Sequence, residues 1–199
     1  MSVTGLLLAA GAGSRMGMPK ALVRDDAGRP WLTHAVSVLL EGGCDEVTVV
    51  LGASADEAEW VLADGLSDLT GVHAVRALAW QAGMGASLRA GLRELAGTSH
   101  DAALVHLVDL PDVTAAVVAR VLAETQPGAS ALARASYDGT PGHPVLLGRD
   151  HWAPVSDAAS GDRGARLYLA VNDPQLVECG DLASGADVDE PTSDQRPAQ

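Results

Sequence analysis

Positive charge is scarce in this chain. The 199 residues include 26 acidic and 13 basic side chains, which give a formal net charge of −13 at pH 7. Surfaces that bind nucleic acids or anionic membranes need a basic footprint. We therefore expect neither a nucleic acid nor a membrane as a partner, and an anionic substrate would have to be met by a local basic pocket.

Cysteine and long apolar segments are also scarce. The two cysteines, Cys44 and Cys179, lie far apart and form no CxxC motif, so the sequence predicts neither a zinc site nor a disulfide framework and fits a reducing cytoplasm. The first residues, MSVTGLLLAAGAGSR, are similar to a secretion signal. They lack leading basic residues, however, and their apolar run is far shorter than the roughly 20 residues of a membrane span. We expect a buried first strand and a cytoplasmic protein.

Lysine occurs only once. Lys20 follows an apolar run and a glycine-rich segment, GLLLAAGAGSRMGMP (residues 5–19), and every other basic residue is an arginine. A compact ammonium group beside free backbone N–H groups is typical of a phosphate site, because lysine acts as a mobile countercharge where arginine imposes a planar fork. The segment therefore predicts a phosphate-binding loop.

Apolar runs alternate with segments of helical spacing along the chain. With 47% apolar residues the chain can bury one full core, so we expect one domain over residues 1–190 and a loose polar tail over 191–199. The alternation is typical of an α/β fold with a mostly parallel sheet, which a hairpin through YDGTPG would make mixed. We predict strands over 3–9, 46–52, 72–77, 102–108, 129–135, 144–147 and 176–179, and helices over 31–41, 54–63, 87–96, 112–124 and 164–171.

Two of these helices carry signals for their first residues. Ser54 and Glu57 have the spacing of a capping box. Asp112 can cap the helix that follows it. Both caps would satisfy backbone N–H groups that the first helical turn leaves free.

Gly11, Gly13 and Gly17 follow the first predicted strand, where backbone amides at the carboxyl edge of a sheet can hold phosphate oxygens. The dinucleotide fingerprint is not met, because it requires G-x-G-x-x-G and an acidic residue after the second strand, which here ends in LGA (residues 51–53). The loop of nucleoside triphosphatases is not met either, because Lys20 is not followed by serine or threonine. The alternative is a glycine turn that only packs closely against a neighbouring helix.

A candidate metal ligand follows the apolar strand LVHLV (residues 104–108). Asp109 would lie at the open edge of the sheet near the glycine loop, where a carboxylate can hold magnesium on phosphates. A second carboxylate could come from Asp187 or Asp189, because alternate residues of an extended segment face the same side. The alternatives are a helix cap for Asp109 and a solvated acidic tail for the segment GADVDEP.

The string LAAGAGSRMGMPK (residues 8–20) resembles the signature of nucleotidyltransferases that activate small molecules with a nucleoside triphosphate. The chain is most similar to the molybdenum-cofactor cytidylyl- and guanylyltransferase family. The resemblance implies a three-layer αβα Rossmann-like sandwich of the nucleotide-diphospho-sugar transferase type and a Mg²⁺-dependent reaction. The last matching motif departs from the family, which continues it into a closing helix. The matching strings, in the family's order, are GMGASLRAGL (83–92), DLPD (109–112), PGHPVLL (141–147), GDRGAR (161–166) and DVD (187–189).

The resemblance also implies roles for single positions. Arg15 and Lys20 would neutralise the departing pyrophosphate, and Asp109 with Asp189 would bind the metal ion. Arg15, Lys20 and Asp109 are thus the implied catalytic residues. The implied nucleotide-binding residues are Leu8, Ala9, Ala10, Gly11, Gly13, Gly17, Gly85 and Ser87.

The family's motifs PGHP and GDRGAR imply the acceptor side, with His143, Arg163 and Arg166 as candidate ligands. Equally open are a turn histidine bonded to backbone and an exposed helix start with ordinary charge pairs. His106 lies inside an apolar strand, so we expect a core residue satisfied by a neighbour and no metal ligand.

Three functions remain open from the sequence. The first is transfer of a nucleotide from CTP or GTP to a phosphorylated acceptor such as molybdopterin, with release of pyrophosphate. A molybdoenzyme or maturation protein would be the partner. The LAAG motif resembles the cytidylyl members of the family more than the guanylyl members. The alternative is an NAD(P)H-dependent oxidoreductase of the nicotine blue oxidoreductase type on the same scaffold, against which the missing dinucleotide fingerprint counts. The third is a non-catalytic nucleotide-sensing or chaperone module, which would not need a metal carboxylate.

Overall fold

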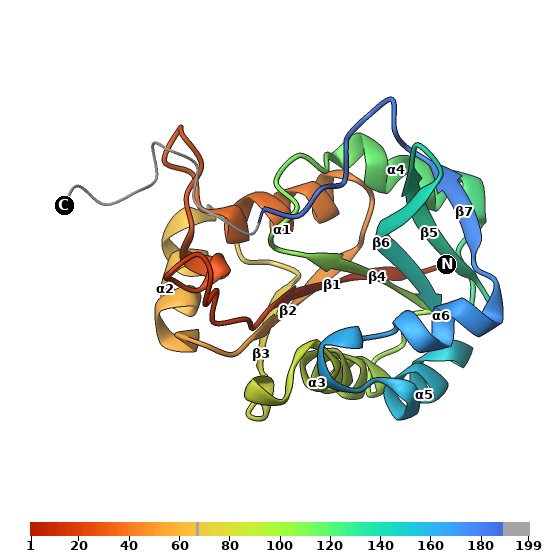
Figure 1. Cartoon of the computed structure of the whole chain (residues 1–199), viewed down its shortest axis with the longest axis horizontal. Helices are drawn as coiled ribbons and strands as arrows, with labels where there is room; N and C mark the ends of the chain where they lie inside the picture. Colours follow the sequence, from red (N-terminus) through yellow and green to blue (C-terminus); the bar gives the residue numbers. More distant parts are fainter. Residues whose placement is uncertain (67, 189–199) are drawn as a thin grey trace.

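The computed structural model describes residues 1–66 and 68–188. Its seven strands form one sheet in the order β3-β2-β1-β4-β6-β5-β7 (Figure 1). Strands β1 to β4 and the pair β5–β7 run parallel, whereas β6 is antiparallel to both of its neighbours. The predicted mixed, mostly parallel sheet is confirmed. The strands are β1 (Val3–Ala9), β2 (Glu46–Leu51), β3 (Val72–Arg76), β4 (Ala102–Leu107), β5 (Leu132–Tyr137), β6 (Thr140–Gly148) and β7 (Gln175–Glu178).

The hairpin between β5 and β6 is tighter than its sequence suggested. Asp138 and Gly139 alone form the turn, and both have positive φ angles, 51° and 77°. This is the conformation of a two-residue turn whose twist matches the flanking strands, and an Asp-Gly pair is the usual sequence for it. The turn predicted over YDGTPG (residues 137–142) was therefore too long, because its last three residues belong to β6.

The six α-helices of the described residues cover the two faces of the sheet (Figure 1). Helices α1, α2 and α4 lie on one face and α3, α5 and α6 on the other, and each face has its own cluster of buried apolar side chains. The predicted three-layer αβα arrangement is thus confirmed. The helices are α1 (Trp31–Glu41), α2 (Ala55–Gly65), α3 (Met84–Ala96), α4 (Ala115–Thr125), α5 (Arg149–Ala158) and α6 (Arg166–Asn172).

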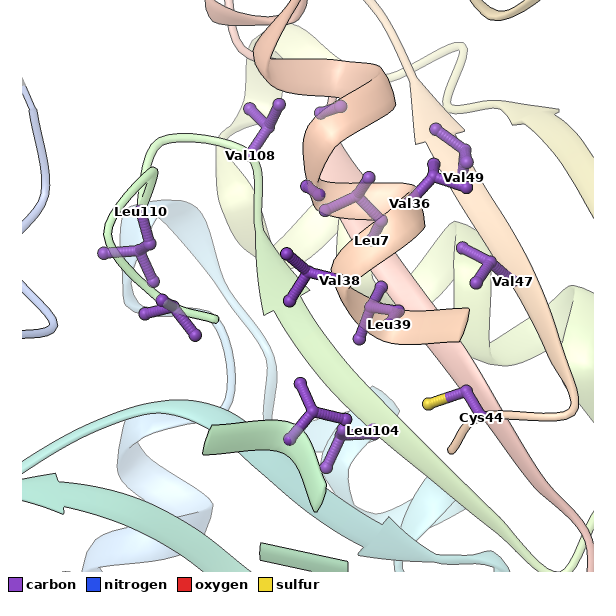
Figure 2. Close-up of a cluster of buried hydrophobic side chains, with 14 of the residues drawn as sticks. Leu7, Val36, Val38, Leu39, Cys44, Val47, Val49, Leu104, Val108 and Leu110 are labelled. Atoms are coloured by element: carbon purple, nitrogen blue, oxygen red, sulfur yellow. The ribbon is translucent and has the colours of Figure 1, made fainter. Parts of the chain in front are cut away.

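The larger cluster lies between α1 and the central strands. In Figure 2 the α1 side chains Val36 and Leu39 reach toward Leu7 of β1 and Val47 of β2, and all four are fully buried. Complete burial of such a side chain contributes about 1.5–3 kcal/mol. The core therefore fixes β1, and with it the start of the glycine-rich loop.

Three helix predictions need correction. Ser54 has a left-handed backbone (φ 51°) and makes no capping hydrogen bond. The residue before it, Ala53, is fixed to the end of β1, because its N–H donates to the Ala10 oxygen. Asp112 does not cap α4, whose N-cap is Thr114. Helix α5 was not predicted, since Pro154 interrupts its pattern and only Trp152 and Val155 are buried.

Within the described residues, no helix is both long enough and apolar enough to span a lipid bilayer. The longest, α3, has 13 residues and buries one face on the sheet.

Candidate active site

The central strands β1 and β4 are parallel neighbours, with Leu8 in register with Leu107. The chain leaves both strands at the same carboxyl edge, which is where ligands bind in open α/β sheets. The glycine-rich loop that follows Ala10 and the segment that begins at Val108 therefore start side by side.

This edge brings the two central predicted residues into contact. The Nζ atom of Lys20 lies 2.7 Å from Oδ2 of Asp109, and their side chains are only 16% and 19% exposed. Lys20 opens a short 3-10 turn whose end is held by Leu22 N–H donating to the Pro19 oxygen. The ion pair thus joins the end of the glycine-rich loop to the end of β4.

The glycine-rich loop folds back on itself at Gly13. Its φ angle is +60°, and a Cβ atom built there would lie 1.9 Å from the carbonyl oxygen of Met18. Only glycine fits this close approach. Gly13 therefore shapes the loop from within, whereas Gly11 has open space around its Cβ position.

A cavity of about 330 Å³ lies above the ends of β1 and β4. Trp80 and Gln81, which the sequence did not single out, complete its wall from the turn after β3. Their only sequence signal is their position after a strand that ends at the same edge. Seven predicted residues line this cavity: Leu8, Ala9, Ala10, Gly11, Lys20, Ser87 and Asp109.

A larger cleft of about 1030 Å³ adjoins the cavity. Asp109 and Asp162 line both spaces, so the Lys20–Asp109 pair marks their junction. Pro141, Val145 and Leu169 give the cleft apolar surface. Besides Leu8 and Asp109, four predicted residues lie in its wall, namely His143, Arg163, Arg166 and Asp187, together with Arg134, which was not predicted.

Two histidines near the cleft are held neutral. Burial, reinforced by the positive charge of Arg134, lowers the pKa of His143 to about 4. Burial also lowers the pKa of His106 to about 3. His106 is a core residue as predicted, but its Nδ1 atom has no hydrogen-bond partner among the described residues.

The candidate metal ligands are only partly described. Asp109 and Asp187 both line the cleft, whereas Asp189 lies outside the described residues, as does the predicted tail. The described residues contain no group of three or more His, Cys, Asp or Glu side chains suited to a metal ion.

The segment after β7 braces the loop that carries Asp109. The Val188 N–H donates to the backbone oxygen of Asp109 at 3.0 Å. Oδ2 of Asp112 accepts hydrogen bonds from the N–H and the hydroxyl of Ser184, at 2.7 and 2.6 Å. Asp112 therefore anchors this segment instead of a helix.

Four predicted residues lie away from both cavity walls. Gly13 and Gly17 shape the loop, and Arg15 lies exposed on it. Gly85 lies inside α3, where a Cβ atom would come within 2.7 Å of the backbone nitrogen of Ser160. Its position serves close packing of α3 against the segment before α6.

The comparison with protein families agrees with this geometry. Residues 5–178 match the model of the MobA-like NTP transferase domain. The chain belongs to this family. The predicted family is thereby confirmed, and the match covers both cavities except for the segment that follows β7.

Individual proteins show two kinds of similarity. The chain is 38% identical over 195 residues to a nicotine blue oxidoreductase from Paenarthrobacter nicotinovorans, covering 94% of this chain and 92% of the relative. A nucleotidyl transferase from Methanothermobacter has the same fold, with a TM-score of 0.72, 24% identity, and coverage of 89% and 87% of the two chains. So does a manganese complex of a Mycobacterium tuberculosis protein, with a TM-score of 0.68, 23% identity, and coverage of 98% and 96%.

Proposed function

We propose that this protein transfers a nucleotide from a nucleoside triphosphate to an anionic small molecule and releases pyrophosphate. The observation that carries this proposal is the Lys20–Asp109 pair at the junction of a small cavity and a larger cleft. A triphosphate in the small cavity and an acceptor in the cleft would meet at that point. Membership in the MobA-like NTP transferase family supports the same reaction.

The proposed step needs no covalent intermediate on the protein. An oxygen of the acceptor attacks the α-phosphorus, the bond between the α-phosphorus and the bridging oxygen breaks, and pyrophosphate leaves with that electron pair. Negative charge then grows on the phosphate oxygens, so catalysis rests on positioning and countercharge. Lys20 and Arg15 would supply the countercharge to the pyrophosphate, and the Gly13 loop would supply backbone N–H groups.

The residues present fit a divalent metal ion. Asp109 offers a carboxylate at the cavity junction, Asp187 lines the same cleft, and such hard oxygen donors suit Mg²⁺ or Mn²⁺. A bound Mg²⁺ would supply further countercharge to the phosphates. Asp109 would hold it there, with Asp189 as the other proposed ligand, and Lys20 would be freed to contact phosphate oxygens.

The remaining walls suggest how each substrate is held. Residues 8–11 and Ser87 would contact the nucleoside, and the resemblance of the LAAG motif to cytidylyl members favours CTP over GTP. His143, Arg163 and Arg166 would contact the acceptor, for which a phosphorylated cofactor such as molybdopterin is the proposed identity. His143 would act as a neutral hydrogen-bonding group, because its pKa is far below 7.

One observation favours a second function. The relative that shares 38% identity over 94% of this chain is named an oxidoreductase. A reductase of this kind would bind NAD(P)H in place of a triphosphate. Against it, β2 ends at Leu51 and continues into Gly52 and Ala53, so no carboxylate follows it to bind a ribose hydroxyl.

A paired assay separates the two functions. Thermal shift is measured with CTP, GTP, ATP and UTP in the presence of Mg²⁺, and separately with NADH and NADPH. Pyrophosphate release is then followed with candidate phosphorylated acceptors. A shift with one or more triphosphates that is lost in Lys20→Ala supports nucleotidyl transfer, whereas a shift only with NAD(P)H rejects it.

A further inference from the structure

Arg134 occupies an unusual position in the acceptor cleft. It lies on β5 inside the sheet, its side chain is half-buried, and it forms part of the cleft wall. Its Nε and Nη2 atoms donate to the backbone oxygen of Gly142, at 3.2 and 3.0 Å. The guanidinium is therefore held in one orientation by the β5–β6 hairpin.

The charge of Arg134 is not balanced by the protein. Across residues 1–66 and 68–188, no carboxylate forms an ion pair with Arg134 or Arg166. Burial, together with the like charge of Arg166, lowers the pKa of Arg134. Two neighbouring cations thus share one wall in a chain whose formal net charge is −13.

The cleft also contains carboxylates, and their positions matter. Asp109 is paired with Lys20, and Asp109 and Asp162 line the junction with the smaller cavity. Asp173 and Asp187 also line the cleft, and neither forms an ion pair with Arg134 or Arg166. Arg134 and Arg166 are therefore cations of the cleft wall that no carboxylate of the described residues pairs with directly.

The sheet register gives the spacing between Arg134 and Asp109. Arg134 is in register with Val145 of β6, and Val145 with Val105 of β4, four residues before Asp109. With ~3.3 Å per residue along a strand and ~4.8 Å between strands, the backbones of Arg134 and Asp109 lie about 16 Å apart. After the length of the Arg134 side chain is subtracted, the distance between its guanidinium group and the Asp109 carboxylate is on the order of 10 Å.

We propose that Arg134 and Arg166 form an anion-binding subsite that takes a second anionic group of the acceptor, a carboxylate or a phosphate, while the attacking oxygen lies near Asp109. The planar fork of arginine binds such groups through two parallel hydrogen bonds. The inference rests on the proposed function, and it restricts the acceptor to molecules with two anionic groups roughly 10 Å apart, joined by a body that fits apolar walls. A monoanionic acceptor would leave the half-buried Arg134 and the exposed Arg166 without a countercharge.

The test uses the full-length protein with Lys20→Ala as background, so that phosphate binding beside Lys20 is removed. Inorganic phosphate and succinate are titrated separately by calorimetry at constant ionic strength. We expect one remaining site for at least one of the two anions. Arg134→Gln should weaken this site about tenfold or more, because it removes charge-assisted hydrogen bonds to the anion. Arg134→Lys should bind with intermediate affinity, since it keeps the charge and loses the fork.

Arg93→Gln is the matched control, because Arg93 is exposed on α3 and lies in neither cavity wall. If Arg93→Gln weakened anion binding as much as Arg134→Gln does, the effect would be one of overall charge, and the proposal would be overturned. So would a folded Arg134→Gln variant with lower melting temperature but unchanged anion affinity, since Arg134 would then only brace Gly142.

An activity measurement separates the subsite from the reaction. Where the wild-type protein transfers nucleotides, Arg134→Gln should raise the KM for the acceptor and leave the KM for the triphosphate unchanged. If no triphosphate reacts at all, the proposed function fails, while the anion titration still decides whether Arg134 and Arg166 bind an anion.

Discussion

The Lys20–Asp109 ion pair can be tested by a double-mutant cycle. Its members lie 2.7 Å apart and are more than four-fifths buried. Removing one member of a fully buried pair costs about 3–5 kcal/mol, and exposed pairs contribute about 0–1 kcal/mol. For this mostly buried pair we expect each of Lys20→Met and Asp109→Asn to destabilise the fold by about 2 kcal/mol.

This free energy corresponds to a measurable change in melting temperature. For a chain of 199 residues, about 2 kcal/mol lowers the Tm by about 4–8 °C. The double variant leaves no unpaired charge, so its Tm should return to within about 2 °C of the wild-type value. Circular dichroism melts of the four proteins measure the coupling.

Activity should behave differently from stability. Loss of either charged group removes a part of the proposed machinery, so each single variant should lower kcat by about 10² or more, equivalent to about 2.7 kcal/mol. The double variant should remain inactive although it regains stability. Pyrophosphate release measures this, and the comparison separates a structural pair from a catalytic one.

The more exposed pair Arg120–Asp181 supplies the control, because its double-mutant cycle should show a coupling of at most about 1 kcal/mol. Additive losses of Tm at Lys20 and Asp109 would refute the reasoning, since the two charges would then not interact in solution. Recovery of activity in the double variant would refute the catalytic assignment.

Three further predictions concern pH, the loop and the metal ion. His106 has a pKa of about 3 in the fold and about 6.5 when unfolded, so between these pH values the unfolded chain binds more protons, and the free energy of unfolding falls with decreasing pH by about 1.4 kcal/mol per unit for this group. Urea unfolding of His106→Leu from pH 7 to 5 should show a weaker dependence of the free energy of unfolding on pH than the wild type, and an unchanged dependence would contradict a buried neutral His106. Gly13→Ala should weaken triphosphate binding, measured by calorimetry, at least about tenfold, because the added Cβ meets the Met18 oxygen. The control Gly28→Ala, at a similar φ angle of +79° but with open space around it, should bind triphosphate with wild-type affinity, and equal affinities of the two variants would show that Gly13 does not shape the triphosphate site. Chelation with EDTA should abolish pyrophosphate release and added Mg²⁺ or Mn²⁺ should restore it, and turnover that persists without metal would exclude the proposed role of Asp109.

The sequence predicted the central elements well because their signals are local. β1, β2 and β4 are buried on both faces, so each appears as a short segment of six or seven mainly apolar residues, VTGLLLA, EVTVVL and AALVHL. The single lysine after a glycine-rich segment identified the residue that meets Asp109. Both signals depend on residues close together in the chain.

The errors arose where distant contacts decide the local structure. Ser54 has the residue type of a cap, but the bond from Ala53 to β1 gives it a left-handed backbone. Asp112 also has a capping residue type, yet a segment more than seventy residues later takes its hydrogen bonds. Arg134 looked like an ordinary strand residue, because only the sheet register reveals that it faces the cleft.

The strand β7 ends at Glu178, and the matched family domain ends there too. The next ten residues nevertheless hold the β4–α4 loop from outside, through Ser184 on Asp112 and Val188 on Asp109. A protein trimmed to the family boundary would keep its sheet but lose these two hydrogen-bonded contacts to the loop that carries Asp109. Sequence changes in this short extension would therefore shift the position of Asp109 without altering any residue of the matched domain.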